Sequence, residues 1–167
     1  ITGYSITDTA SAVSAASDVI VTSASGVVLS DSGFTTSSVA VAEKVHGTNG
    51  GSVANYHLVD SAANLVASST GLRSFATNIT VSGDDANVAQ ANTLAATESL
   101  GTVSYDVSGT VAEIVNVGND AGINAATNIT ATGNANVAQA VTILASTNSG
   151  TKSYQINDTA ASLATVV

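Results

Sequence analysis

Four tyrosines divide this chain into segments of nearly equal length. They stand at Tyr4, Tyr56, Tyr105 and Tyr154, spaced 52, 49 and 49 residues apart. Each opens a similar stretch of ten residues, namely YSITDTASAV, YHLVDSAANL, YDVSGTVAEI and YQINDTAASL. A period of about 50 residues predicts an array of structural repeats, in which each unit buries its apolar face only against its neighbours.

The first half of each repeat is expected to form a short strand and then a helix. Apolar residues alternate from the tyrosine, as at Tyr56 and Leu58, which is typical of a half-buried strand. An aspartate follows four residues after three of the tyrosines and precedes an Ala-rich run. We therefore expect its carboxylate to cap the helix and to complement the helix dipole. These aspartates are Asp8, Asp60 and Asp158.

The third repeat departs from the others at one position. Gly109 replaces the aspartate, so we expect the cap of that helix to come from Ser108 or Thr110. The apolar face of the helix is kept, because Val111 and Ile114 stand six and nine residues after the tyrosine, as apolar residues do in the other repeats.

The second half of each repeat is expected to form another strand and another helix. Two of these strands begin Asn-Ile-Thr, and two of the helices begin Val-Ala-Gln-Ala. From the first valine of each helix to the next tyrosine is 17 residues in all three cases, so insertions fall in the predicted loops. The strand segments are 26–29, 78–81 and 128–131, and the helices begin at Val39, Val88 and Val137.

This order of strand, helix, strand and helix predicts an α/β repeat solenoid with about two coils per 49-residue unit, since solenoids that pair one strand with one helix use about 20–29 residues per coil. Its expected divisions are repeat 1 at 4–55, repeat 2 at 56–104, repeat 3 at 105–153 and a partial fourth repeat or inter-subunit docking segment at 154–167. An all-β sandwich or β-helix is the alternative, because Thr, Val and Ser are abundant.

Composition and charge exclude several classes of partner. The net charge is −9, with only three basic residues, so the surface lacks the clustered Lys and Arg that nucleic acids and anionic membranes require. No apolar stretch reaches the roughly 18 residues of a membrane helix, and no membrane insertion is expected. Charged residues make up 9%, against about 25% in ordinary soluble domains, which favours an extracellular or cell-surface location.

The chain ends fourteen residues into its fourth repeat. Two interpretations stay open: the sequence is an excerpt of a longer array, or the last segment docks on another copy of the chain. A solenoid end without a polar cap exposes a sheet edge and an apolar layer, which favours head-to-tail stacking. The expected assembly residues are Tyr154, Ile156, Leu163, Val166 and Val167.

The element Tyr-x-apolar-x-Asp-Thr-Ala-Ala-x-Leu, joined to a Val-Ala-Gln-Ala helix, resembles the DTAAxL-type tandem repeats of large bacterial surface and secreted proteins. The resemblance covers nearly the whole chain and is best from Tyr56 to Leu163. It implies an extracellular scaffold, adhesin or fibre.

Candidate chemistry is sparse. His46 and His57 are the only histidines, they lie in no metal-binding spacing, and no GxSxG turn is present, so no enzyme is expected. The repeated aspartates are the only candidate for a row of Ca²⁺ sites. Calcium takes about six to eight oxygens, whereas these acids are single and one repeat apart, so we expect no cofactor.

Glycosylation is the modification that the sequence suggests. Asn78, Asn128 and Asn157 begin sequons, and Thr9, Ser61 and Thr159 follow an aspartate in a pattern like that of bacterial O-glycosylation. Helix capping explains the second set without any sugar.

The expected function is structural, with copies of the chain stacked head to tail into a filament or surface stalk. The alternative is an adhesin that binds surface glycans through its polar strands.

Overall fold

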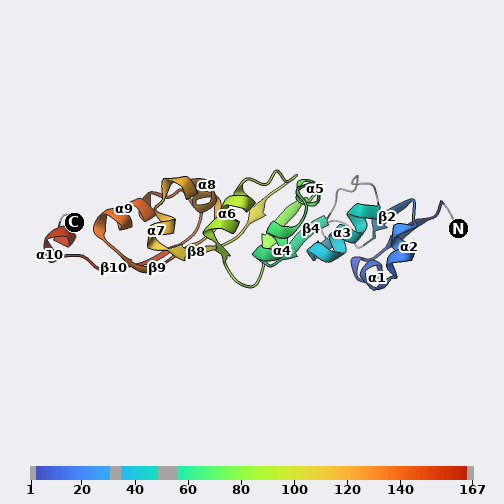
Figure 1. Cartoon of the computed structure of the whole chain (residues 1–167), viewed down its shortest axis with the longest axis horizontal. Helices are drawn as coiled ribbons and strands as arrows, with labels where there is room; N and C mark the ends of the chain where they lie inside the picture. Colours follow the sequence, from blue (N-terminus) through green and yellow to red (C-terminus); the bar gives the residue numbers. More distant parts are fainter. Residues whose placement is uncertain (1–2, 31–34, 49–55, 165–167) are drawn as a thin grey trace. The chain divides into compact units, whose positions relative to one another are not determined.

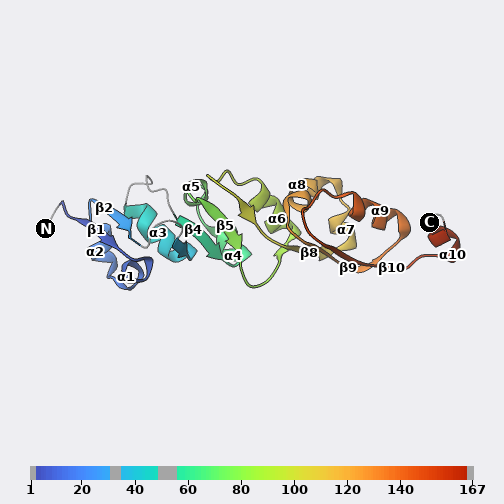
Figure 2. The same ribbon diagram turned by 180° about the vertical axis from the view of Figure 1, so that it is seen from behind.

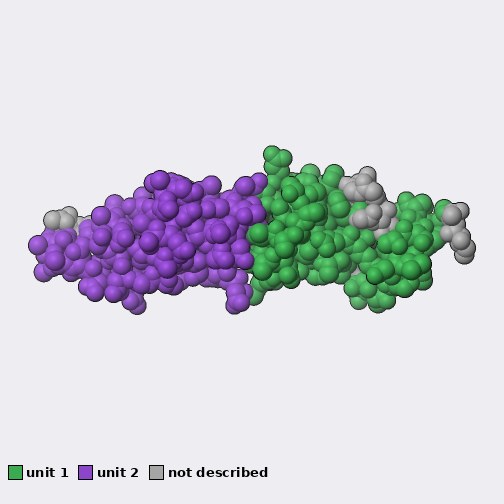
Figure 3. Space-filling model, in the orientation of Figure 1, with its two compact units in different colours: residues 1–83, 97–103 green, residues 84–96, 104–167 purple. Residues whose placement is uncertain are grey.

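The computed structural model describes residues 3–30, 35–48 and 56–164. These residues form a mixed α/β structure with parallel sheets, divided between two compact units (Figure 3). Unit 1 comprises residues 1–83 and 97–103, and unit 2 comprises 84–96 and 104–167. The predicted α/β class is therefore confirmed, and the all-β alternative is wrong.

Unit 1 holds a two-stranded sheet, β1-β2, and a sheet of order β3-β4-β5-β7. Strand β1 pairs with β2 in parallel, and β4 pairs in parallel with β3 on one side and β5 on the other. The strands are β1 (Ser5–Asp8), β2 (Gly26–Leu29), β3 (Thr35–Ser37), β4 (Tyr56–Asp60), β5 (Asn78–Val81) and β7 (Val103–Ser104), the last of which begins at the end of unit 1.

The helices of unit 1 follow the strands as the sequence predicts, with one addition. A second short helix stands between the first helix and the next strand, at α2 and again at α5. The helices are α1 (Ala10–Ala15), α2 (Asp18–Thr22), α3 (Val39–Thr48), α4 (Ala62–Ala67) and α5 (Thr70–Ser74).

Unit 2 is built around one parallel sheet of order β10-β9-β8-β6. Its helices lie on one side of β8, β9 and β10 in both views (Figures 1 and 2). Its elements are β6 (Ala86–Asn87), α6 (Val88–Ala95), β8 (Val107–Thr110), α7 (Val111–Ile114), the 3-10 helix η1 (Val117–Asn119), α8 (Asp120–Ala125), β9 (Ile129–Ala135), α9 (Val137–Ala145), β10 (Lys152–Ile156) and α10 (Ala160–Leu163).

The cores are made almost entirely of aliphatic side chains. Burial of each Leu, Ile or Val contributes about 1.5–3 kcal/mol, so many small side chains replace the few aromatic ones of an ordinary core. In unit 1 the fully buried residues include Val21, Val27, Val45, Tyr56, Leu58, Leu65, Leu72 and Ile79, and in unit 2 the corresponding residues are Leu94, Val107 and Ile129.

The helix caps correct one prediction. The residue at each N-cap is the hydroxyl residue after the aspartate, namely Thr9, Ser61 and Thr159. A short hydroxyl side chain on an extended backbone reaches the N–H three residues on, and the preceding carboxylate bonds instead to the N–H of the cap residue itself. In the third repeat the cap is Thr110, one of the two expected residues, and it forms a capping box with Glu113.

The glycine at residue 109 is explained by close packing against α6. A Cβ at this position would lie 2.6 Å from Cγ2 of Val88, the first residue of α6. The strand end and the helix therefore approach too closely for a side chain. Helix α6 is capped by its own box of Asn87 and Gln90.

Candidate assembly site

The tyrosines of the internal strands are core residues. Tyr56 and Tyr105 are 0% and 2% exposed. The Tyr56 hydroxyl donates to the carbonyl oxygen of Leu72 at 2.5 Å, and the Tyr105 hydroxyl donates to that of Gly122 at 2.8 Å. Burial raises the pKa of both phenols to about 12. Both side chains hold their own unit together and are closed to a partner.

The last strand and helix expose apolar side chains that their counterparts bury. Ile156 in β10 is 45% exposed and Leu163 in α10 is 40% exposed, while Tyr154 is half-buried. Counted from the tyrosine, the same positions in repeats 2 and 3 are held by Leu58 and Val107, and by Leu65 and Ile114, which are at most 3% exposed, whereas Ile6 in repeat 1 is only partly buried. The segment predicted to mediate assembly thus presents apolar surface. Val166 and Val167, the other two predicted residues, lie outside the described residues.

Strand β10 is an edge strand of its sheet. Among the strands that the structure describes, it pairs only with β9, which lies beside it in Figures 1 and 2. The pairing is parallel, with a register shift between Ser153 and Gln155. Strand β1 in unit 1 is likewise paired only with β2 among the described strands. An edge strand offers backbone N–H and C=O groups to which a further strand can add.

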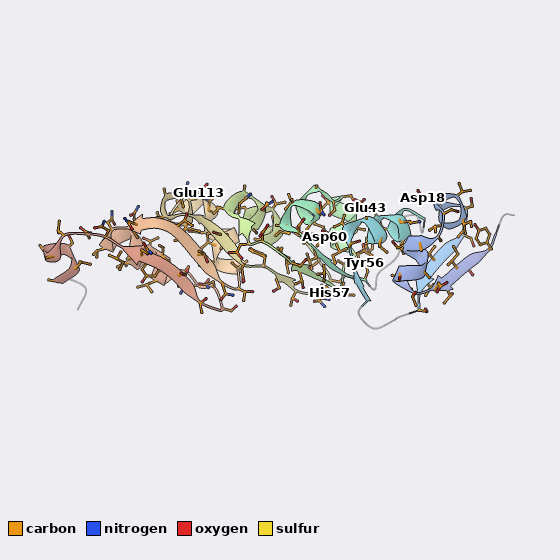
Figure 4. All side chains as sticks on the ribbon, turned by 90° about the horizontal axis from the view of Figure 1, so that it is seen from below. Asp18, Glu43, Tyr56, His57, Asp60 and Glu113 are labelled. Carbon is orange, nitrogen blue, oxygen red and sulfur yellow. The ribbon has the colours of Figure 1, made fainter. Side chains whose placement is uncertain are left out.

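Asp60 and Asp158 each link two helix N-termini. Asp60 Oδ1 accepts from the N–H of Ser61, the N-cap of α4, at 2.8 Å, and its Oδ2 accepts from the N–H of Val39, the first residue of α3, at 3.0 Å. Asp158 makes the same two contacts with the N-cap of α10 and the first residue of α9, at 2.7 and 3.0 Å. Figure 4 shows Asp60 with Tyr56 and His57 on β4.

These contacts favour the ionised form of both carboxyl groups. Burial opposes ionisation of Asp60, but hydrogen bonds from the Asn64 side chain and from two backbone N–H groups outweigh it and lower the pKa. The backbone N–H groups of Val137 and Thr159 lower the pKa of Asp158. Both carboxylates therefore act as hydrogen-bond acceptors at helix N-termini.

Asn78 and Asn128, two of the predicted glycosylation sites, brace each strand against the loop beside it. Asn78 Oδ1 accepts from the N–H and the hydroxyl of Thr102, at 3.0 and 2.8 Å. Asn128 Oδ1 accepts from the same two groups of Thr151, both at 2.8 Å, while its Nδ2 donates to Asp106. Both asparagines are half-buried. This pair of braces escaped the sequence analysis, although the recurring Asn-Ile-Thr was visible.

The other predicted glycosylation sites lie nearer the surface. Thr9, Thr159 and Asn157 are exposed, and Ser61 is half-buried. The hydroxyls of Thr9, Ser61 and Thr159 accept hydrogen bonds from the N–H groups three residues on. Modification of all six residues stays a prediction.

Arg73 has a role that the sequence did not indicate. It is only 7% exposed, and its guanidinium donates to the carbonyl oxygens of Leu65 and Val66 in the last turn of α4 and of Ser68 at its C-cap. A cation at a helix C-terminus is favoured by the helix dipole. Arg73 thus joins the end of α4 to α5.

Within the described ranges, no three His, Asp or Glu side chains gather as a metal site would require. His57 Nε2 lies 2.8 Å from Thr80 Oγ1 on the neighbouring strand, and the ring of His46 packs beside Phe75 with centroids 5.6 Å apart. Across residues 3–30, 35–48 and 56–164, every helix falls short of the length and hydropathy needed to cross a bilayer.

Comparison with family models, with curated proteins and with solved structures finds no match for this chain. Its function is therefore argued from its own geometry.

Proposed function

We propose that the chain is a structural protein of the cell surface or extracellular space, built as a repeat solenoid, whose copies stack head to tail into a filament or stalk. The observation that carries this proposal is the exposure of Ile156 and Leu163 at positions that are buried in repeats 2 and 3. The two side chains have the residue types and spacing of a core, and no described repeat covers them.

The two edge strands support a head-to-tail arrangement. Strand β10 and strand β1 each have one unpaired side among the described strands, and each opens a tyrosine-type repeat. The main-chain groups of β10 would pair with β1 of the next copy, and Ile156 and Leu163 would then be covered by that copy. A contact between two different surfaces of one protein generates rings or filaments.

The recurrent geometry supports the solenoid. The tyrosine hydroxyl bonds to the carbonyl 16 or 17 residues later in three repeats, at Tyr4, Tyr56 and Tyr105. The low charge fits an extracellular repeat protein.

The test compares the natural chain with an I156N/L163N variant by sedimentation velocity and negative-stain electron microscopy. We expect the natural chain to form larger particles as its concentration rises, and the variant to remain a monomer with an unchanged circular dichroism spectrum. The matched control is V117N, since Val117 is 80% exposed and belongs to the 3-10 helix. A natural chain that is monomeric at all concentrations would refute the proposal, as would assembly that the double substitution leaves intact. Saturable binding of that monomer to a glycan array would indicate the adhesin alternative.

A further inference from the structure

Helix α9 exposes an apolar face made by Val141 and Leu144, which are 50% and 55% exposed. The adjacent side of the helix is buried, with Ala140 at 4% and Ile143 at 1%. The sequence of α9, VAQAVTILA, contains no charged residue. This α9 face is therefore apolar, with one cation at its end, because the Lys152 ammonium donates to the carbonyl oxygen of Leu144 at 3.1 Å.

Helix α6 shows what covers the equivalent face. The two helices share the same capping box, Asn-Val-Ala-Gln, so Val141 and Leu144 of α9 align with Asn92 and Ala95 of α6. Both residues of α6 are half-buried, because α8 packs there. Asn92 Oδ1 accepts from the N–H of Gly122 in α8 at 3.1 Å, and a Cβ on Gly122 would lie 2.6 Å from the backbone nitrogen of Asn92.

The counterpart of α8 in the first repeat is α2. The tyrosine hydroxyls identify the equivalent residues, because Tyr105 donates to the carbonyl of Gly122 and Tyr4 donates to the carbonyl of Ile20. Ile20 is 53% exposed and its neighbour Val19 is 74% exposed. Leu72, the residue bonded by the second tyrosine, is fully buried. Helix α2 thus exposes a position that both counterparts bury.

The two exposed faces are apolar where α6 and α8 make a close polar contact, and a side chain at the Gly122 position means that α9 and α2 would pack farther apart than α6 and α8 do. Where α6 carries Asn92 and α8 carries Gly122, α9 carries Val141 and α2 carries Ile20. The hydrogen bond of the internal contact is thereby replaced by two apolar side chains, one on each helix. An apolar pair leaves no buried polar group unsatisfied when the two faces meet.

We infer that the α9 face of one copy is covered by α2 of the next copy, with Val19 and Ile20 against Val141 and Leu144. This inference rests on the proposed head-to-tail stacking and adds a contact in the helix layer to the strand contact at β10. It also fixes the polarity of the assembly, since α9 always meets α2 and never a second α9.

The chain has no cysteine, so engineered disulfides report this contact directly. An I20C preparation is mixed with a V141C preparation under mild oxidation, and the formation of the cross-linked dimer is followed on denaturing gels. A V117C preparation replaces V141C as the control. We expect the first pair to cross-link at least about ten times faster than the control pair, because a disulfide needs Cα atoms about 4.4–6.8 Å apart.

A second variant tests the same contact without new chemistry. The V141N/L144A variant gives α9 the residues that α6 already carries, so its helix should fold, and its assembly should be weakened. If the chain assembles but I20C and V141C cross-link no faster than the control pair, or the V141N/L144A variant assembles as the natural chain does, the α9–α2 contact is refuted and stacking through β10 remains. A chain that does not associate at all refutes both.

Discussion

Removing the buried hydroxyl of Tyr56 should lower the free energy of unfolding of unit 1. In a Tyr56→Phe variant the ring is kept and only the hydrogen bond to the Leu72 carbonyl is lost. A typical net hydrogen bond contributes about 0.5–1.5 kcal/mol, and leaving a buried acceptor unpaired costs about 1–3 kcal/mol. Tyr56 and Leu72 are both 0% exposed, so water cannot replace the lost donor without disturbing the core. We therefore expect a loss of about 1.5 kcal/mol in the free energy of unfolding.

The assay is urea unfolding followed by circular dichroism. With a urea slope of about 1–3 kcal/mol/M, a loss of this size moves the midpoint down by about 0.5–1.5 M at an unchanged slope. The matched control is Tyr154→Phe, because the Tyr154 side chain is only half-buried and its hydroxyl bonds to no described residue. The reasoning is refuted if Tyr56→Phe leaves the midpoint in place, or if the control lowers it equally.

Three further outcomes are expected. The raised pKa of Tyr56 and Tyr105, about 12 against an ordinary 10.0, means that each contributes stability below pH 10 that is lost as the pH rises towards 12. Each contribution is about 3 kcal/mol, so ionisation of Tyr56 and Tyr105, followed by tyrosinate absorbance, should accompany unfolding, and ionisation of these two phenols before unfolding would contradict this. The lowered pKa of Asp60 gives stability that is complete above about pH 5 and lost as the pH falls below about 4. In an acid titration followed by circular dichroism, an Asp60→Asn variant should therefore lose stability less steeply than the natural chain. In urea unfolding, the Gly109→Ala variant should lose about 1–3 kcal/mol of unfolding free energy by overpacking. The Gly71→Ala variant should lose less, because its Cβ would meet only one atom, at 3.5 Å. Equal midpoints for the two variants would count against the packing argument.

The positions of most strands and helices could be predicted because local patterns specify them. The segment at 78–81 is a strand because its apolar residue alternates with polar ones, and the helices at Val88 and Val137 begin after asparagines that cap them. The short helices α2 and α5 were missed because five residues are too few to show a helical period. The hydroxyl cap of Ser69, before α5, was the only available signal.

The candidate site could be predicted only in part. The sequence places Ile156 and Leu163 at core-type positions, but their exposure depends on what packs against them, which no local pattern records. The same holds for Asp60. Its position before a helix could be read from the sequence, but its hydrogen bond to Val39 depends on two distant segments meeting in the fold. The exposed face of α9 is recognised as unusual only when its residues are compared with the equivalent, half-buried residues of α6.

The bond from Val39 to Asp60 spans 21 residues, and the equivalent bond from Val137 to Asp158 spans the same number. A ribosome makes the chain from its N-terminus, so α3 emerges before the carboxylate that completes its first turn. A nascent chain that stops short of residue 60 holds this helix without that acceptor, and a chain a few residues longer supplies it. Helices α3 and α9 should therefore each gain the last hydrogen bond of their first turn during synthesis, once the strand that follows the helix has left the ribosome.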